Sequence, residues 1–436
     1  MRTTVVAAGA IFVAAVAAVP YVSGRMVEHD IRDALDGYNK RQSLVTASIV
    51  DYERNWLRSE FVTKLSVRDG GEVARATTRL RHAPFNGLQF ASGESEVHFA
   101  QSYAATEHYY FDGRTPLELS FDVDFTGGAS GLLRSSAVDK PVIATKDARI
   151  VAGASSGRFS IARDKTFRFD WSMPKAGFDD GKLSMAVEGL AVSAHGQLGD
   201  DDLSEPSGFK LSLASYRAQQ GPRHIAARNV SVSTQMTPAA ETLRFGLAVR
   251  SGAGEIAVDA TTPYAWESLD FACSLFDVQK APVIKYSAEL RNVSGVDASD
   301  SQRVLLAMRA LSDLAAGLAE GEPVFAVDKL EVRTPHGNAA ASMRVSIDKA
   351  RMTAGVAAWS ATEGVIMSGR ASISRGLAVR LVATASGGEP AAQNAIAQLT
   401  ARGVVRENGD ALEFDLAARD GVYMVNGVRA SELARM

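Results

Sequence analysis

The sequence predicts an all-β protein of extended antiparallel sheets, arranged as a sandwich or an open groove, with an N-terminal transmembrane helix and two or three accessory helices. Three observations lead to this prediction. Apolar and polar residues alternate over much of the chain, glycine-containing turn signals separate the alternating segments, and a long uncharged apolar segment begins the sequence.

The N-terminal segment predicts a membrane anchor. Residues 3–22 contain no charged side chain, and Arg2 is the only charged residue before them. A helix of this length, at about 1.5 Å per residue, spans roughly 30 Å, which is the hydrocarbon thickness of a bilayer. We therefore assign residues 1–23 to a transmembrane or signal anchor. By the positive-inside rule, Arg2 keeps the N-terminus in the cytoplasm, so that the bulk of the single-pass chain is periplasmic.

A cleaved signal peptide is the alternative interpretation of this segment. Ala15-Val16-Ala17 resembles a cleavage site, and cleavage there would release the chain into the periplasm. The apolar run nevertheless continues to Val22, beyond the usual length of a signal peptide's apolar region. The uncleaved anchor is therefore favoured.

Residues 24–42 predict a juxtamembrane amphipathic helix, and residues 43–436 a periplasmic β-rich domain with a candidate subdivision near 285–300. In the helix, the apolar side chains follow one another at spacings of three and four residues, as the stripe of an amphipathic helix does. They are Val27, Ile31, Leu35 and Tyr38.

Strands are predicted by alternation with a period of two, which gives a strand one buried and one solvated face. In residues 117–125 every odd position is apolar and every even one polar. The same pattern recurs at 57–67, 167–173, 183–187, 209–213, 243–249, 343–347, 377–383 and 412–416. Turn signals lie between such segments at Asp69-Gly70-Gly71, Asp112-Gly113, Asp180-Gly181, Asn408-Gly409 and Asp420-Gly421.

Two later segments predict helices. Residues 301–320 place Val304, Met308, Leu311, Ala315 and Leu318 on one face. Residues 390–402 begin with a proline, end before a glycine, and carry a similar apolar stripe. We expect each helix to lie with its stripe on the apolar face of a sheet, or to close the end of a groove.

Composition excludes some functions. The formal net charge is −3 and no block of basic residues occurs, which argues against a nucleic-acid partner. The single cysteine, Cys273, cannot form an intrachain disulfide. It shares a strand face with Phe271 and Leu275, so we expect a small buried side chain rather than a reactive thiol.

Catalytic and metal-binding motifs are weak or absent. None of the seven histidines belongs to a zinc motif, and no cofactor is expected. Gly153-Ala154-Ser155-Ser156-Gly157 matches G-x-S-x-G, but the alternating residues after it predict a strand where a nucleophile elbow needs a helix. Two S-x-x-K matches, at 172–175 and 346–349, also lie in strand-like sequence. The acidic loop at 200–205 could hold calcium, but a solvated loop is favoured.

Several short segments together resemble the YdgA family of bacterial inner-membrane proteins, which carry a domain of unknown function. Gly24 and Glu28 match the family's G-x-x-x-E start. The other segments are 52–59 with Trp56, 81–85 with His82 and Pro84, 321–323 with Pro323, 334–337 with Gly337, and 420–427 with Asn426 and Gly427. Asn55 and Ala83 replace glycines that are usual in the family.

The resemblance implies an inner-membrane location and a β fold, but it brings no established catalytic residues. The motif positions are therefore interpreted as structural. His82 and His336 each lie near a proline within such a motif, and they form either a functional pair or two turn-capping residues. A looser similarity, in architecture alone, is to AsmA-like envelope proteins, which are thought to carry lipids along an apolar groove.

These observations favour a non-enzymatic envelope protein that binds apolar or lipid-like ligands. Its expected partners are the bilayer, through the N-terminal helix, and a lipid or an envelope protein. The alternative is a structural or protein-interaction module that recognises partners at its strand edges. A periplasmic hydrolase using Ser155 or a histidine-centred site is the least favoured interpretation.

Overall fold

The computed structural model describes Arg32, Leu35, Asp36 and Asn39, and residues 45–55, 58–67, 71–82, 89–124, 128–197, 205–239, 241–258, 263–295, 300–348, 364–386, 388–419 and 421–433. The chain divides into two compact units. Unit 1 comprises residues 1–211 and 290–303, and unit 2 comprises residues 212–289 and 304–436. The boundary at Leu211 lies within strand β12 (Glu205–Gln220).

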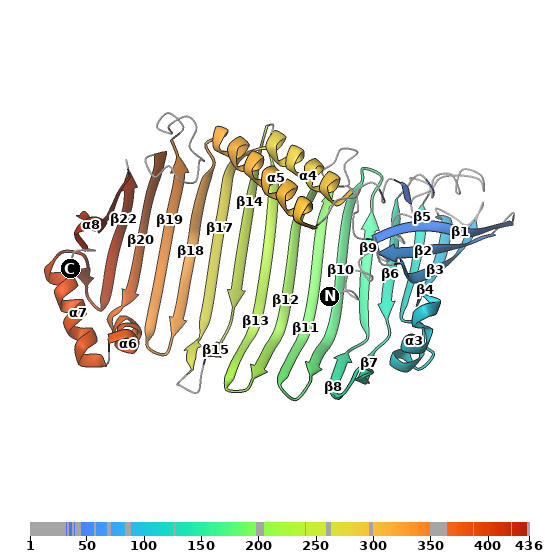
Figure 1. The fold of residues 1–436 in the computed structure, drawn as a ribbon, viewed down its shortest axis with the longest axis horizontal. Helices are drawn as coiled ribbons and strands as arrows, with labels where there is room; N and C mark the ends of the chain where they lie inside the picture. Colours follow the sequence, from blue (N-terminus) through green and yellow to red (C-terminus); the bar gives the residue numbers. More distant parts are fainter. Residues whose placement is uncertain are drawn as a thin grey trace. The chain divides into compact units, whose positions relative to one another are not determined.

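Unit 1 is an antiparallel sheet in which neighbours along the chain mostly pair with each other (Figure 1). Its pairing order is β1-β2-β3-β4-β5-β6-β9-β10-β11, and β8 pairs with the far end of β10 and with β7. The strands are β1 (Val45–Asn55), β2 (Arg58–Val67), β3 (Gly71–His82), β4 (Gln89–Phe99), β5 (Leu117–Asp124), β6 (Ala129–Ser135), β7 (Val138–Val142), β8 (Thr145–Ala152), β9 (Ser155–Ile161), β10 (Thr166–Asp179) and β11 (Leu183–Gln197); a 3₁₀ turn, η1 (Gln101–Tyr103), and α3 (Ala104–Phe111) follow β4.

Unit 2 is also an antiparallel sheet, with pairing order β13-β14-β17-β18-β19-β20-β22-β23-β24 (Figure 1). Its strands are β13 (Arg223–Pro238), β14 (Thr242–Ser251), β15 (Gly254–Ala257), β16 (Tyr264–Trp266), β17 (Ser268–Gln279), β18 (Val324–Thr334), β19 (Gly337–Ile347), β20 (Val365–Ser374), β21 (Arg406–Asn408), β22 (Ala411–Arg419), β23 (Val422–Val425) and β24 (Val428–Arg429). The helices after β17 are α4 (Lys280–Gly295), α5 (Asp300–Glu320), α6 (Arg375–Ser386), α7 (Glu389–Ala401) and α8 (Ala430–Leu433).

The prediction of a mostly β chain with antiparallel strands and few helices is confirmed. The predicted membrane helix at 1–23 lies outside the described residues. Among the helices that the structure describes, none combines the length and the hydropathy that a membrane span needs. The candidate subdivision near 285–300 stays a prediction.

The juxtamembrane helix is described at four of its residues, all of which are helical. Leu35 is buried and belongs to the core of unit 1. Asn39 joins this helix to β1, because its amide nitrogen donates to the carbonyl of Ala47 at 2.7 Å and its oxygen accepts from the Ala47 N–H at 2.8 Å. This part of the predicted amphipathic helix therefore packs on the β domain.

Unit 1 has a continuous buried core on one face of its sheet. The core extends from Val45 on β1 to Phe159 on β9, and Leu65 and Ala74 within it are fully buried. Phe61 stacks on Tyr52 with 5.8 Å between the ring centroids. Burial of this kind supplies most of the stability of a domain.

Two local predictions are wrong. Residues 377–383 were expected to form a strand, but they lie in α6. Every position there except Arg380 is apolar, so the pattern does not exclude a helix. The helix is stabilised by the packing of Ala378 against Ile396 of α7. Asp112-Gly113 does not join two strands; Asp112 ends α3 in the left-handed conformation at φ 54°.

Helix α5 was correctly predicted, but its expected burial is wrong. Val304, Met308 and Leu311 are 58%, 64% and 54% exposed. The helix instead turns its small residues towards α4: Ala310 is buried, and a β-carbon at Gly317 would lie 2.7 Å from Pro282. Helix α7 follows the prediction better, since Ala392 and Ile396 are buried, although Leu399 is exposed.

This orientation of α5 gives a first testable prediction. Met308→Ser should change the free energy of unfolding by less than about 0.5 kcal/mol, because the side chain is largely exposed. Ala310→Leu should cost about 1–3 kcal/mol, because the larger side chain overpacks the contact with α4. Denaturant unfolding of the two variants checks this order, and the reverse order would show that the predicted stripe is the buried one.

Candidate functional site

The most unusual surface of unit 2 is one face of its sheet, where apolar residues form continuous rows across six strands (β14, β17, β18, β19, β20 and β22). Cross-strand register defines each row, since directly opposed residues lie on the same face. The rows are Val249-Phe271-Leu330-Ala341-Ala371-Phe414, then Leu247-Cys273-Val327-Met343-Gly369-Leu416, and then Phe245-Leu275-Phe325-Val345-Met367-Ala418. We call these three rows the apolar face.

The residues of the apolar face are less buried than the core residues of unit 1. Except for Ala418, which is buried, its residues are half-buried, or exposed in the case of Phe325 at 37%. The buried cluster of unit 2 that the structure describes, Ala378, Ile396, Val405 and Leu412, lies beside α6 and α7 and reaches the rows only through Phe414. Contiguous apolar surface of this extent is typical of a binding site.

The opposite face of the same strands carries ion pairs, and it also contains the buried Ser274 and Ala326. Asp270 lies 3.3 Å from the Arg250 guanidinium and 2.9 Å from the Lys329 ammonium, which also lies 3.2 Å from Glu331. The Lys329 ammonium, and after it Arg250, hold the pKa of Asp270 below its usual value. The sheet is therefore two-sided, with solvated ion pairs behind the apolar face.

Cys273 lies in the middle row of the apolar face. It is half-buried, not fully buried as its neighbours in the sequence had suggested. Burial, and to a smaller extent the Asp328 carboxylate, raises the pKa of its thiol above the usual value. A thiol with a raised pKa is a poor nucleophile, which agrees with a packing role.

The C-terminal motif residues form a tight turn that holds several segments together. Asn426 and Gly427 have φ of 49° and 83° and connect β23 to β24, as the two central residues of a type I′ turn do. The Asn426 side chain accepts from the Asp415 N–H at 2.7 Å and donates to the carbonyls of Val404 and Glu413 at 2.8 and 3.0 Å.

The motif at 334–337 is also a turn, between β18 and β19. The Thr334 hydroxyl donates to the Gly337 carbonyl at 2.8 Å and accepts from the His336 N–H at 3.1 Å. Gly337 has φ 123°, and any β-carbon there would collide with Ser374. Pro323 lies in the short connection from α5 to β18. These contacts hold the turn together, and the interpretation of the motif positions as structural stays a prediction.

The remaining motif residues belong to unit 1 or lie outside the described residues. Gly24, Glu28, Trp56 and Pro84 lie outside them, and His82 is described only in its backbone, at the end of β3. His336 is exposed in the β18–β19 turn. A functional role for these two histidines stays a prediction.

The structure describes only some of the residues in the candidate catalytic and metal-binding motifs, and their roles stay untested. Ser155 opens β9, is 6% exposed, and has its hydroxyl within hydrogen-bond distance of the Ser135 hydroxyl and the Trp171 ring nitrogen, at 2.7 and 3.0 Å. Ser172 and Lys175 lie in β10 and Ser346 in β19, while Lys349 and the acidic residues 200–202 lie outside the described residues. Within the described part of the chain, no three or more His, Cys, Asp or Glu side chains come together in a way that could hold a metal ion.

Sequence reasoning found the alternation of the strands but not the rows of the apolar face. The rows join residues far apart in the sequence, such as Leu247 and Leu416, and only the register brings them together. The available signal was that residues 243–249, 343–347 and 412–416 each carry apolar residues at every second position.

No curated protein and no solved structure is found to match the chain. A family of bacterial proteins of unknown function, DUF945, matches residues 1–431, which is almost the whole sequence. Because this match covers almost its whole length, the chain belongs to the DUF945 family of bacterial proteins of unknown function.

Proposed function

We propose that this protein is a non-enzymatic, membrane-anchored periplasmic member of the YdgA family, and that the apolar face of unit 2 binds acyl chains or similar lipid-like ligands. The observation that carries the proposal is the set of three half-exposed apolar rows. The uncharged segment at residues 3–22 supports the location, since it would hold the chain at the inner membrane, where such ligands are abundant.

The dimensions of the apolar face suit an extended hydrocarbon chain. Neighbouring strands lie about 4.8 Å apart, so six strands give rows roughly 24 Å long. A chain lying along a row would contact one apolar position per strand, and each methylene group moved from water to this surface would contribute up to about 0.8 kcal/mol. The looser resemblance to AsmA-like proteins points in the same direction, as an analogy in architecture alone.

Lipid analysis of the detergent-purified full chain tests the proposal. Native mass spectrometry and lipid extraction should find a bound fatty acid or phospholipid in the unaltered protein. Met343→Glu places a charge in the centre of the apolar face and should lower ligand occupancy at least about tenfold, because the bound chain would desolvate the carboxylate.

The matched control is Ser342→Glu, which puts the same side chain on the opposite, solvated face of the same strand. It should retain the ligand. Absence of lipid from the unaltered protein, or equal loss in both variants while circular dichroism shows intact sheets, would contradict the proposal.

A protein-interaction role is the second candidate, and the exposed side of α5 favours it. Val304, Leu305, Met308 and Leu311 present a stripe on which an envelope protein could dock. Crosslinking in membranes distinguishes the two functions, because a lipid-binding protein needs no stable protein neighbour at α5.

A further inference from the structure

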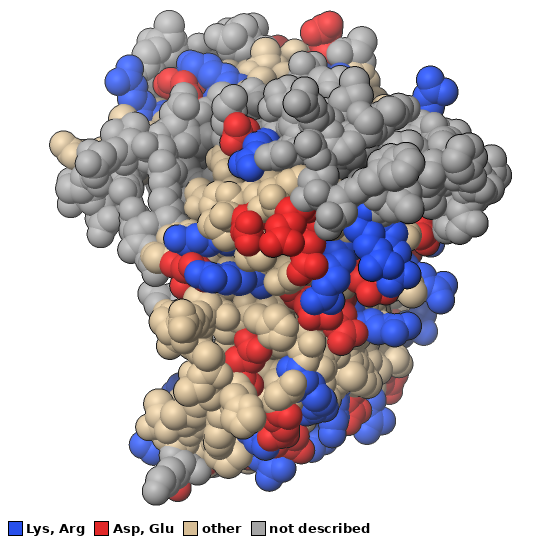
Figure 2. Space-filling model, turned by 90° about the vertical axis from the view of Figure 1, so that its right-hand side faces the viewer, with Lys and Arg blue, Asp and Glu red and all other residues tan. Residues whose placement is uncertain are grey.

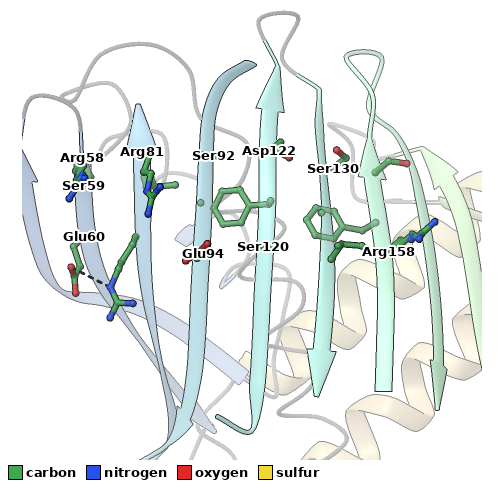
Figure 3. Close-up of a pocket in the computed structure, with 18 of the residues that line it drawn as sticks. Arg58, Ser59, Glu60, Arg81, Ser92, Glu94, Ser120, Asp122, Ser130 and Arg158 are labelled. Carbon is green, nitrogen blue, oxygen red and sulfur yellow. Dashed lines mark ion pairs between the residues drawn. The ribbon is translucent and has the colours of Figure 1, made fainter. Parts of the chain in front are cut away.

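A second surface, on the polar face of unit 1, is hollowed into a cavity of about 770 Å³. Its lining comes from strands β1, β2, β3, β4, β5, β6, β9 and β10 (Figure 3). Most of the lining side chains are exposed and polar or charged, and they alternate with the core residues Leu80, Phe121 and Phe159, which also line the cavity. Lys, Arg, Asp and Glu side chains are interspersed over the side of the molecule that Figure 2 presents. The cavity is thus a polar site with fixed charges, unlike the apolar face of unit 2.

Two arginines stand directly opposite each other in this cavity. Arg58 of β2 pairs in register with Arg81 of β3, both side chains are exposed, and Figure 3 shows them next to each other. Like charges in directly opposed positions of an antiparallel pair repel each other. The position therefore favours a negative charge between the two guanidinium groups.

Nearby carboxylates do not supply this charge. Within the described part of the chain, neither Arg58 nor Arg81 has an acidic group within 4.0 Å. Glu60 lies instead 3.7 Å from Arg79, which is also 3.3 Å from Glu96. Glu53 and Glu94 also line the cavity, but neither carboxylate lies within 4.0 Å of the Arg58 or Arg81 guanidinium group.

The neighbouring strands complete the set of hydrogen-bonding groups. Ser92 of β4 lies directly opposite Arg81, so that two guanidinium groups and one hydroxyl can donate to the same ligand group. Further along the same row are Asp122, Ser130 and Ser160. A carboxylate such as Asp122 accepts hydrogen bonds and repels anions, so it suits a ligand's hydroxyl groups rather than a second acidic group.

We propose that this cavity binds a ligand with one phosphate or carboxylate group, held by Arg58, Arg81 and Ser92, and a hydroxyl-bearing body that extends over Asp122, Ser130 and Ser160. Arginine forks match phosphate and carboxylate oxygens in bidentate geometry. The site lies in unit 1 and does not depend on ligand binding by the apolar face. The same chemistry is offered by a free polyol phosphate and by the headgroup of a glycerophospholipid.

Isothermal titration of the detergent-purified full chain with sn-glycerol 3-phosphate tests the proposal. Glycerol 3-phosphate should bind more tightly than inorganic phosphate, and glycerol alone should not bind detectably. Arg58→Gln and Arg81→Gln should each weaken binding at least tenfold. Neither variant should lower the melting temperature of the ligand-free protein, because each relieves the repulsion between the two arginines.

Arg134→Gln is the matched control, since Arg134 is an exposed arginine of β6 that does not line the cavity. Binding should survive this change. A short-chain phosphatidylglycerol that binds more tightly than glycerol 3-phosphate would identify a lipid headgroup as the source, and equal binding would identify a free ligand. Absence of phosphate-dependent binding, or an equal effect of Arg134→Gln, would overturn the proposal.

Discussion

Phe61→Ala is expected to lower the free energy of unfolding by about 3–5 kcal/mol. Phe61 is 1% exposed, stacks on Tyr52, and lies within the continuous core of unit 1. Removing the ring leaves a cavity that the surrounding β strands cannot close, so both transfer free energy and packing are lost. Denaturant titration followed by circular dichroism measures the change.

Phe325→Ala is the matched control for this prediction. The residue type and the substitution are the same, but Phe325 lies on the apolar face of unit 2 and is 37% exposed. Its removal should cost less than about 1.5 kcal/mol in the ligand-free protein, because little buried contact is lost. Equal costs for the two variants would contradict the difference in packing between the two units.

Asn426→Ala is expected to destabilise unit 2 by about 2–3 kcal/mol. The change removes one acceptor and two donors, and it leaves the Asp415 N–H and the carbonyls of Val404 and Glu413 without their partner. It also places alanine at φ 49°, a backbone conformation that costs alanine about 1 kcal/mol. Denaturant titration of the variant measures its free energy of unfolding and so tests the combined cost of the lost hydrogen bonds and the strained backbone.

Two variants separate the contribution of the side-chain hydrogen bonds from that of the backbone conformation. Asn229 has a similar φ of 51°, and the described residues offer its side chain no hydrogen bond, so Asn229→Ala should carry only the backbone cost. Asn426→Gly removes the side-chain bonds but relieves the backbone, so it should be less destabilising than Asn426→Ala. If Asn229→Ala costs as much as Asn426→Ala, the hydrogen bonds of Asn426 contribute nothing.

Local sequence patterns predicted much of the secondary structure correctly. The strict alternation at 117–125 and the glycine turn at Asp180-Gly181 predict β5 and the β10–β11 hairpin, because both signals are fixed by neighbouring residues. Alternation gave a wrong prediction at 377–383, because the apolar residues there fit the period of a helix as well as that of a strand. Contact with α7 stabilises the helix. It also could not predict that α5 would expose its larger side chains, since Ala310 and Gly317 allow a closer approach to α4.

The candidate sites were less accessible to sequence reasoning than the strands. Arg58 and Arg81 appear in two separate motifs, and nothing in either motif indicates that they stand opposite each other. The rows of the apolar face likewise depend on register, including the bulge between Val327 and Leu330 that keeps both residues on one side. Pairing between segments far apart in the chain depends on the whole sheet, so a local sequence pattern cannot predict it.

The partly solvent-exposed apolar rows of unit 2 also affect the heat capacity change of unfolding. The heat capacity increment of unfolding, about 12–15 cal/mol/K per residue in ordinary globular domains, follows the apolar area newly brought into water. A face that already touches water in the native state contributes less to this increment. We therefore expect the free energy of unfolding of unit 2 to vary less steeply with temperature when the face is empty, and more steeply when an acyl chain covers it.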